Sequence, residues 1–181
     1  MDKKEEEDLN KFIWESNAIE NVKSQEAFDD SYSAWRYIQG QIDNFTKISI
    51  PAIERIHSEV MRRLQLDIAG KFRDTDMVVG GGGKITGHKE VQSQMENWIR
   101  LYSVIPTFGR ASTDEGKGLI AGHIKKAHIA FENIHPFYDG NGRVGRLIML
   151  WQRVVAGLPI EIIYERQKEK YYEWFREGNG D

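Results

Sequence analysis

The chain has 181 residues, 40% of them hydrophobic and 29% charged, a composition typical of one globular domain. Its net charge of −3 gives no basis for general nucleic-acid binding, and the lack of cysteine excludes disulfides and thiolate chemistry. The charged N-terminus MDKKEEEDLN is no signal peptide and no apolar run approaches the roughly 18 residues of a membrane span, so we expect a cytoplasmic protein without membrane contact.

Hydrophobic residues recur at helical spacing along most of the chain. Ser49 is a suitable N-cap with Pro51 in the first turn, and Gly157 with Pro159 can end a later helix. The segment from Met77 to His88 breaks the pattern, because four glycines separate two short apolar stretches, and it predicts a hairpin flap. The expected helices cover residues 6–22, 25–39, 49–66, 91–105, 118–134, 143–155 and 166–175.

These elements predict one domain over residues 1–181, an all-α, mainly helical bundle with one short β-hairpin at 77–88. The GGGGK run in that hairpin is not a P-loop: the glycine spacing is wrong, and Ile85 stands where Ser or Thr is needed.

The stretch HPFYDGNGRVGR, residues 135–146, concentrates polar chemistry between two apolar helices. Pro136 disfavours helical geometry at His135, so the imidazole should emerge from a loop. Gly140 and Gly142 allow close backbone approach, and a helix beginning near Arg143 directs free N–H groups into that loop.

The charged residues of this stretch fit a nucleotide phosphate. Arg143 and Arg146 are three apart on a helix and can face the same anion. Asp139 offers an oxygen ligand for Mg²⁺, and His135 can accept a hydroxyl proton near neutral pH. A base, a metal ligand and a phosphate clamp are the recurring parts of phosphoryl-type transfer. A glycine-rich turn with solvated charges explains each residue alone but not the whole string.

The same stretch resembles the signature of the Fic family, HPFx(D/E)GNGRxxR, at every specified position. AHIAFENIHPF, IERIHSEVM with GKFR, and YYEWFREGNGD resemble further parts of that fold, so the resemblance covers roughly residues 45–181. It implies the Fic fold and a protein adenylyltransferase, which moves AMP from ATP to a Ser, Thr or Tyr hydroxyl of a target protein. Phosphate transfer, found in a branch with a bulkier, lysine-bearing core, is disfavoured by the intact GNGR.

The resemblance also implies a role for each residue of the motif. His135 is the base, Asp139 holds Mg²⁺ on the α- and β-phosphates, and Arg146 clamps the γ-phosphate. The remaining nucleotide-binding residues are Gly140, Asn141, Gly142 and Arg143. We therefore expect ATP and Mg²⁺ at a catalytic loop over residues 135–146.

Two further segments resemble family features. SNAIEN, residues 16–21, resembles the inhibitory motif (S/T)xxxE(G/N), in which Ser16 and Glu20 share a helix face. The resemblance predicts an inhibitory helix over residues 1–24, with Glu20 paired to Arg146. It also predicts that the flap binds an extended target segment by β-augmentation, at the edge formed by Lys84, Ile85, Thr86 and Gly87.

Several alternatives stay open at this point. A de-AMPylating hydrolase of the same fold would use Glu20 to orient water, whereas a nucleotide-binding regulatory module would need neither His135 nor Asp139. The partner can be another protein or the chain itself by auto-AMPylation, and a homo-oligomer is also open. His57 and His128 are expected to be structural, and a C-terminal tyrosine, Tyr171 or Tyr172, could line an adenine pocket.

Overall fold

All regular structure in the described part of the chain is helical. The computed structural model describes residues 3–78, 85–105 and 113–177. The helices are α1 (Lys3–Ile19), α2 (Gln25–Asp43), α3 (Ile50–Met61), η1 (His88–Glu90), α4 (Val91–Tyr102), α5 (Asp114–Ile134), α6 (Asn141–Val155), η2 (Glu165–Gln167) and α7 (Lys168–Glu177).

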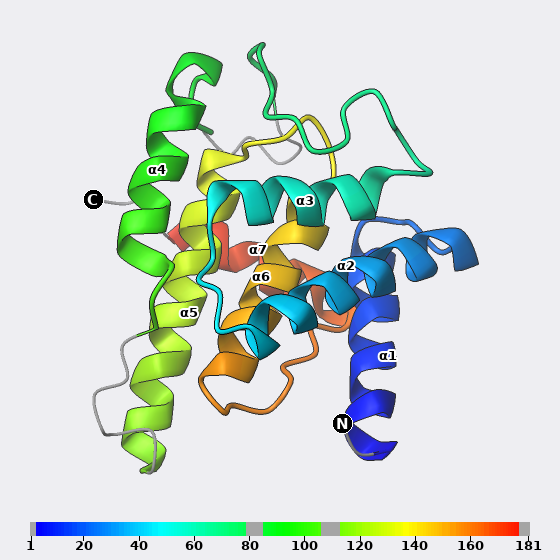
Figure 1. The fold of residues 1–181 in the computed structure, drawn as a ribbon. Coiled ribbons are helices and arrows are strands. Elements are labelled where there is room, and N and C mark those ends of the chain that lie inside the picture. The colour runs from blue at the N-terminus through cyan, green and yellow to red at the C-terminus, as the bar shows by residue number, and fades with distance from the viewer. Residues whose placement is uncertain (1–2, 79–84, 106–112, 178–181) are drawn as a thin grey trace.

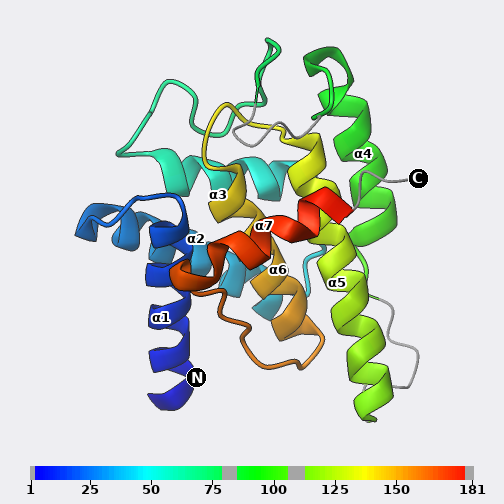
Figure 2. The same ribbon diagram turned by 180° about the vertical axis from the view of Figure 1, so that it is seen from behind.

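Helix α6 is the centre of the bundle (Figure 1). It contacts α1, α2, α3 and α5, while α7 packs on α5 and crosses the opposite side of the molecule (Figure 2). Twelve of its 15 residues are buried, from Asn141 to Arg153 with only Gly142 excepted. A helix that is buried nearly all round must place its polar residues against partners, and α6 begins with three of them, Asn141, Arg143 and Arg146.

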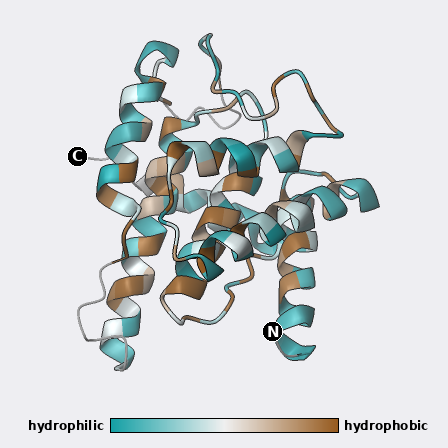
Figure 3. Ribbon diagram, in the orientation of Figure 1, coloured by the Kyte–Doolittle hydropathy of each residue, from teal (hydrophilic) through white to brown (hydrophobic). Residues whose placement is uncertain are grey.

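The apolar side chains form two clusters inside the bundle, and the outer faces are mostly hydrophilic (Figure 3). The larger cluster contains side chains from each of the helices α1, α2, α3, α4, α5 and α6, among them Trp98, Phe131 and Trp151. The smaller one lies under α7 and includes Ile19, Met149 and Tyr171. Both clusters contact α6, the larger through Val144, Leu147 and Ile148 and the smaller through Met149, so the helix is held from two sides.

The expected helix signals act locally as predicted. Ser49 accepts a bond from the amide of Ala52 at 3.4 Å, with Pro51 in the first turn of α3. Gly157 has a φ of 67°, and the amide of Leu158 bonds to the carbonyl of Arg153 at 2.9 Å, which closes α6.

Some details differ from the sequence-based expectations. Helix α3 ends at Met61, so Leu64 is 41% exposed instead of joining its buried stripe. Val154 and Val155 are exposed because the last turn of α6 extends past the core. The described parts of the predicted flap, residues 77–78 and 85–88, contain no strand, and its tip lies outside the described residues. The fold is thus all-helical, without a confirmed hairpin.

No helix in the described part of the chain is long and apolar enough to cross a membrane.

Candidate active site

His135 stands at the junction between α5 and the loop that leads to α6. Its backbone is left-handed, with φ 50° and ψ 62°, and its amide still bonds to the carbonyl of Phe131 at 3.0 Å. Pro136 prevents the helix from continuing, as the sequence predicts. A left-handed non-glycine residue is uncommon and costs about 1–3 kcal/mol, so the surrounding contacts must hold His135 in this conformation.

The loop after His135 is short and closed by one side chain. Asn141 accepts a bond from the amide of Phe137 at 2.9 Å and donates one to the Phe137 carbonyl at 2.8 Å. Its amide group is therefore committed to the loop, and Asn141 shapes the site instead of offering its side chain to a ligand. Gly140 has a φ of 77°, and a Cβ there would lie 2.8 Å from the sulfur of Met61, so the turn requires glycine.

His57, on α3, packs against this loop and forms a hydrogen bond to it. Its Nδ1 accepts a bond from the amide of Gly70 at 2.8 Å, so Nε2 carries the proton and donates to the carbonyl of Asp139 at 3.0 Å. Its ring stacks on Phe137 with centroids 3.7 Å apart. Burial lowers the pKa of His57 to about 4, which keeps the ring neutral and these two bonds intact near neutral pH.

The N-terminus of α6 presents backbone amides that have no intrahelical partner. The amides of Asn141, Gly142 and Arg143 precede the first intrahelical bond, from Val144 to the Gly140 carbonyl at 3.0 Å. The Arg143 side chain is 2% exposed, yet its Nε and Nη1 atoms have no hydrogen-bond partner. Nη2 donates to the sulfur of Met61 at 3.2 Å. A buried guanidinium with two unpartnered nitrogens is costly, and an anion with several oxygens would satisfy it.

Asp139 lies next to Arg143 at the start of α6. Its side chain is 54% exposed, with Oδ1 at 3.8 Å from Nη2 of Arg143 and 2.6 Å from the amide of Gly140. One accessible carboxylate beside a phosphate site is the usual protein contribution to Mg²⁺ binding, since Mg²⁺ keeps waters and takes its other ligands from the phosphates. The residues present therefore fit a Mg²⁺ ion shared with a nucleotide.

In contrast to Arg143, each of the three guanidinium nitrogens of Arg146 has a hydrogen-bond partner. Its Nε and Nη2 atoms bond to Ser16 Oγ at 2.9 Å and to the Ser16 carbonyl at 2.8 Å. The same Nη2 forms an ion pair with Glu20 at 2.7 Å, and Nη1 donates to the hydroxyl of Tyr171 at 3.1 Å. Two of the three residues of SNAIEN that the motif specifies, Ser16 and Glu20, thus contact this arginine.

The end of α1 aims Glu20 at the site. The helix ends at Ile19, before the predicted limit of residue 24. Asn21 is left-handed with a φ of 59°, and the amide of Val22 bonds to the carbonyl of Asn17 at 3.0 Å, the pattern of a Schellman cap. Glycine and asparagine are the residues that tolerate this conformation, which explains their place after the glutamate in the motif. A Cβ at Gly142 would overlap Oε1 of Glu20, so the carboxylate lies directly over the start of α6.

Behind Arg146 lies a buried network that the sequence interpretation did not assign. Because Tyr171 accepts from Arg146, its own proton points to Nε2 of His128, 2.8 Å away. Burial lowers the pKa of His128 to about 3 and raises that of Glu132 to about 8. Tyr171 is 3% exposed and its hydroxyl is bonded to Arg146 and His128, so it holds the arginine in place, while an adenine pocket at Tyr171 or Tyr172 stays a prediction.

The predicted docking segment lies beside the catalytic loop. Thr86 donates its amide to the carbonyl of Asn133 at 3.1 Å, near the end of α5, and Ile85 is partly exposed. Gly87 is extended, with φ −61° and ψ 144°. Lys84, the first residue of the predicted edge, lies outside the described residues.

The segment is joined to His135 through Arg73, which the sequence interpretation did not single out. Its guanidinium donates to the carbonyl oxygens of Thr86 and His135. The only sequence signal was its place at the end of GKFR.

The pKa of His135 is lowered from its usual value. Burial is the main cause, a hydrogen bond with the backbone of Glu132 opposes it, and the positive charge of Arg73 adds to the lowering. Glu20 and Asp139 act in the opposite direction. The imidazole is therefore neutral near pH 7, the state in which it can accept a proton.

Comparison with known proteins places these features in a family. A profile of the Fic/DOC family matches residues 47–152. The protein adenylyltransferases Fic of Drosophila erecta and Drosophila willistoni are each 30% identical, over 151 and 152 residues that cover 81% of this chain. Those residues correspond to only 28% of each relative, so the chain spans little more than a quarter of their length.

Solved structures agree on the fold. A Fic domain-containing signaling protein from Bacteroides thetaiotaomicron superposes with a TM-score of 0.77 over 98% of this chain and 74% of its own, at 16% identity. Fic-1 from C. elegans gives a TM-score of 0.75 over 94% of this chain and 55% of its own, at 19% identity. At such identities these matches establish the fold alone.

Proposed function

We propose that this chain, which belongs to the Fic/DOC family, transfers AMP from ATP to a side-chain hydroxyl of a protein. One observation carries the proposal: a buried arginine, Arg143, has two unpartnered nitrogens beside the free N-terminus of α6 and an accessible carboxylate. That combination fits a polyphosphate with its metal. The Drosophila relatives that the chain matches are named protein adenylyltransferases, which supports the same reaction.

In the proposed reaction His135 accepts the proton of the target hydroxyl. The hydroxyl oxygen forms a bond to the α-phosphorus of ATP, the bond from that phosphorus to the bridging oxygen breaks, and pyrophosphate leaves. The Arg143 side chain and the amides of Asn141, Gly142 and Arg143 bind phosphate oxygens, and Asp139 would hold Mg²⁺, which neutralises phosphate charge when bound. The lowered pKa of His135 keeps the base available at neutral pH.

We further propose that the chain inhibits itself through Glu20. The γ-phosphate of ATP needs Arg146, but Glu20 and Ser16 hold that guanidinium and the carboxylate lies over Gly142. Keeping the site closed in about 99% of the molecules requires a free-energy difference of about 2.7 kcal/mol between the closed and open states. This is half of the ~5.5 kcal/mol that would shift the two populations from about 1:99 to about 99:1. A buried ion pair that costs about 3–5 kcal/mol to break is sufficient.

The target is proposed to bind beside the base, along Ile85, Thr86 and Gly87. Both backbone groups of Thr86 already bond to α5 or to Arg73. An added strand would therefore pair with the backbone groups of its neighbours, as alternation along an extended segment requires.

Glu20 supports one second candidate, removal of AMP from a modified protein. A carboxylate next to the N-terminus of α6 could orient a water molecule toward the same phosphorus. Incubating AMP-modified protein with Mg²⁺ and without ATP separates the two activities. Loss of AMP that depends on Glu20 would support the hydrolase.

The proposed transferase is tested by intact-mass spectrometry after incubation with Mg·ATP. We expect the Glu20→Gly variant to gain the mass of one or more AMP groups and the parent chain to gain far less. A gain of the mass of phosphate instead of AMP would contradict the proposed transferase. So would the absence of any added mass, on the variant and on an added general protein substrate that bears hydroxyl groups.

A further inference from the structure

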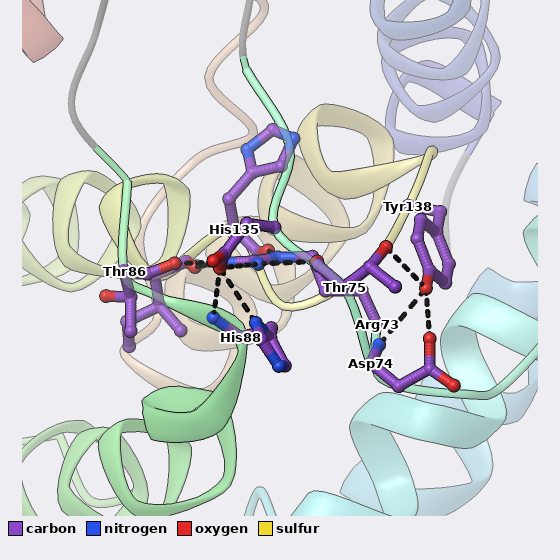
Figure 4. Close-up of polar contacts among 9 residues, drawn as sticks. Arg73, Asp74, Thr75, Thr86, His88, His135 and Tyr138 are labelled. Atoms are coloured by element: carbon purple, nitrogen blue, oxygen red, sulfur yellow. Dashed lines mark hydrogen bonds and ion pairs between the residues drawn. The ribbon is translucent and has the colours of Figure 1, made fainter.

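Arg73 lies between the catalytic loop and the proposed docking segment. Its guanidinium is fully buried and donates to carbonyl groups on both sides (Figure 4). The bond to the His135 carbonyl is 2.8 Å, the bond to Ile134 is 3.4 Å, and the bond to Thr75 is 3.1 Å. The carbonyl of Thr86 accepts a further bond from Nη2.

The carbonyls of Ile134 and His135 belong to the end of α5. Helix C-termini leave their last carbonyls without partners and carry partial negative charge, which a buried cation satisfies. Arg73 also donates its backbone amide to the Pro136 carbonyl at 2.9 Å. These contacts surround the left-handed backbone of His135, so Arg73 can stabilise the conformation that directs its imidazole away from the guanidinium (Figure 4).

The opposite side of Arg73 fixes the docking segment. Thr86 is bonded through its carbonyl to Arg73 and through its amide to Asn133. His88 follows Thr86 by two residues. Asp76 Oδ1 accepts bonds from the amide of His88 at 2.8 Å and from its Nδ1 at 2.9 Å. The same carboxylate oxygen lies 3.9 Å from Nη1 of Arg73. The segment is thus tied to the same guanidinium at one end of α5.

We propose that Arg73 is a positioning residue that holds the base, His135, and the docking segment at Thr86 in one fixed arrangement, so that a docked hydroxyl meets the imidazole. The inference rests on the proposed function for the role of His135 and of the docking segment. Arg73 touches neither the phosphate-binding atoms nor the target. It acts through two backbone carbonyls, each from one side of the site.

Charge and geometry in Arg73 can be separated by substitution. Arg73→Met removes both the charge and the forked donors, whereas Arg73→Lys keeps a charge but loses the fork. Arg153→Met is a matched control: Arg153 is also a buried arginine that caps a carbonyl, that of Pro159 at 2.8 Å, but at the other end of α6.

Two measurements by NMR need no enzymatic activity. We expect the Thr86 amide to exchange with solvent about tenfold faster in Arg73→Met and in Arg73→Lys, the factor given by about 1.4 kcal/mol for one lost hydrogen bond. The pKa of His135 should rise in Arg73→Met, since the nearby positive charge is gone, and stay at the parent value in Arg73→Lys. Arg153→Met should change neither quantity.

The third measurement is AMP transfer in the Glu20→Gly background. We expect both Arg73 variants to lower kcat by about tenfold or more with the KM for Mg·ATP within about twofold, because the phosphate clamp is untouched. A role in folding alone would lower the amount of folded protein without changing the pH profile or the exchange of Thr86.

Folded Arg73 variants with parental Thr86 exchange and a parental His135 pKa would overturn the proposal. If Arg73→Met does not fold, Arg73→Lys decides alone: parental Thr86 exchange contradicts the proposal and faster exchange supports it. If the Glu20→Gly protein transfers no AMP, the proposed function fails, while the NMR results still judge the role of Arg73.

Discussion

Arg143 and Arg146 lie three residues apart on α6 and are both buried, yet their surroundings are opposite. Arg143 keeps two nitrogens without a partner, whereas Arg146 bonds to Ser16, Glu20 and Tyr171. One guanidinium is prepared for an anion that is not part of the chain, and the other already has one supplied by α1. We therefore propose that α6 carries an open half-site at Arg143, where a phosphate would bind, and a closed half-site at Arg146, which the Glu20 carboxylate occupies.

The largest effect on AMP transfer is expected at His135, the proposed base. His135→Ala, made in the Glu20→Gly background, should lower AMP transfer by at least about 100-fold, because a general base contributes about 10²–10⁴. Labelled AMP incorporation measures this, and Mg·ATP binding by calorimetry should be retained. Transfer at the rate of the Glu20→Gly protein would remove His135 from its proposed role.

Substitution of the closed arginine should destabilise the fold. Arg146→Met breaks the ion pair with Glu20 and the bonds to Ser16 and Tyr171. Losing a buried pair costs about 3 kcal/mol, or roughly 6–12 °C in Tm for a domain of this size. Differential scanning calorimetry measures the change. A parental Tm would mean that the contacts of Arg146 contribute nothing net to the folded state.

Substitution of the open arginine should act in the opposite direction on stability. Arg143→Met replaces a buried charge that has two unpartnered nitrogens with an apolar side chain of similar length. We expect a gain of about 1 kcal/mol, or roughly 2–4 °C in Tm, together with a loss of transfer in the Glu20→Gly background. A lower Tm would show that Arg143 is as well satisfied as Arg146, and the contrast between them would disappear.

Buried titratable groups also predict a pH dependence of stability. His57 and His128 have pKa values of about 4 and 3 in the fold, so only the unfolded chain takes up their protons as the pH falls below about 6.5. Glu132, with a pKa of about 8, holds a proton that the unfolded chain releases above about 4.5, so its stabilisation is lost as the pH rises toward 8. Each group contributes up to about 1.4 kcal/mol per pH unit.

These opposing terms predict a maximum of Tm near pH 6.5. Below it the histidines with lowered pKa values, led by His57 and His128, outweigh Glu132, and above it Glu132 has the largest effect. Glu132→Gln should flatten the alkaline side and leave the acidic side in place. A Tm that declines equally between pH 6.5 and 8 in both proteins would rule out a protonated Glu132.

Much of the open half-site could be predicted from local sequence. The positions of Pro136, Gly140 and the two arginines follow from helix ends and helical spacing. Local pattern started the helix near Arg143, whereas α6 begins two residues earlier, at Asn141. The loop is shorter because Asn141, taken as part of the anion hole, bonds to Phe137 and starts the helix.

The closed half-site depends on contacts between distant parts of the chain. Arg146 and Glu20 are separated by 126 residues, and only the resemblance of SNAIEN suggested their pairing. The sequence suggested Tyr171 only as a candidate for an adenine pocket, because nothing in its own helix reveals that its hydroxyl reaches Arg146. The contacts of Arg73 and Glu132 could not be predicted from the sequence either, because packing brings them together with backbone carbonyls and with buried charges from distant parts of the chain.

The most direct test of the central claim compares initial rates of AMP transfer from labelled Mg·ATP for the parent chain and for Glu20→Gly. The account predicts a rise of about 100-fold, the factor that corresponds to a site about 99% closed. Equal rates in the two proteins, at equal Tm and equal Mg·ATP concentration, would contradict a site closed by Glu20.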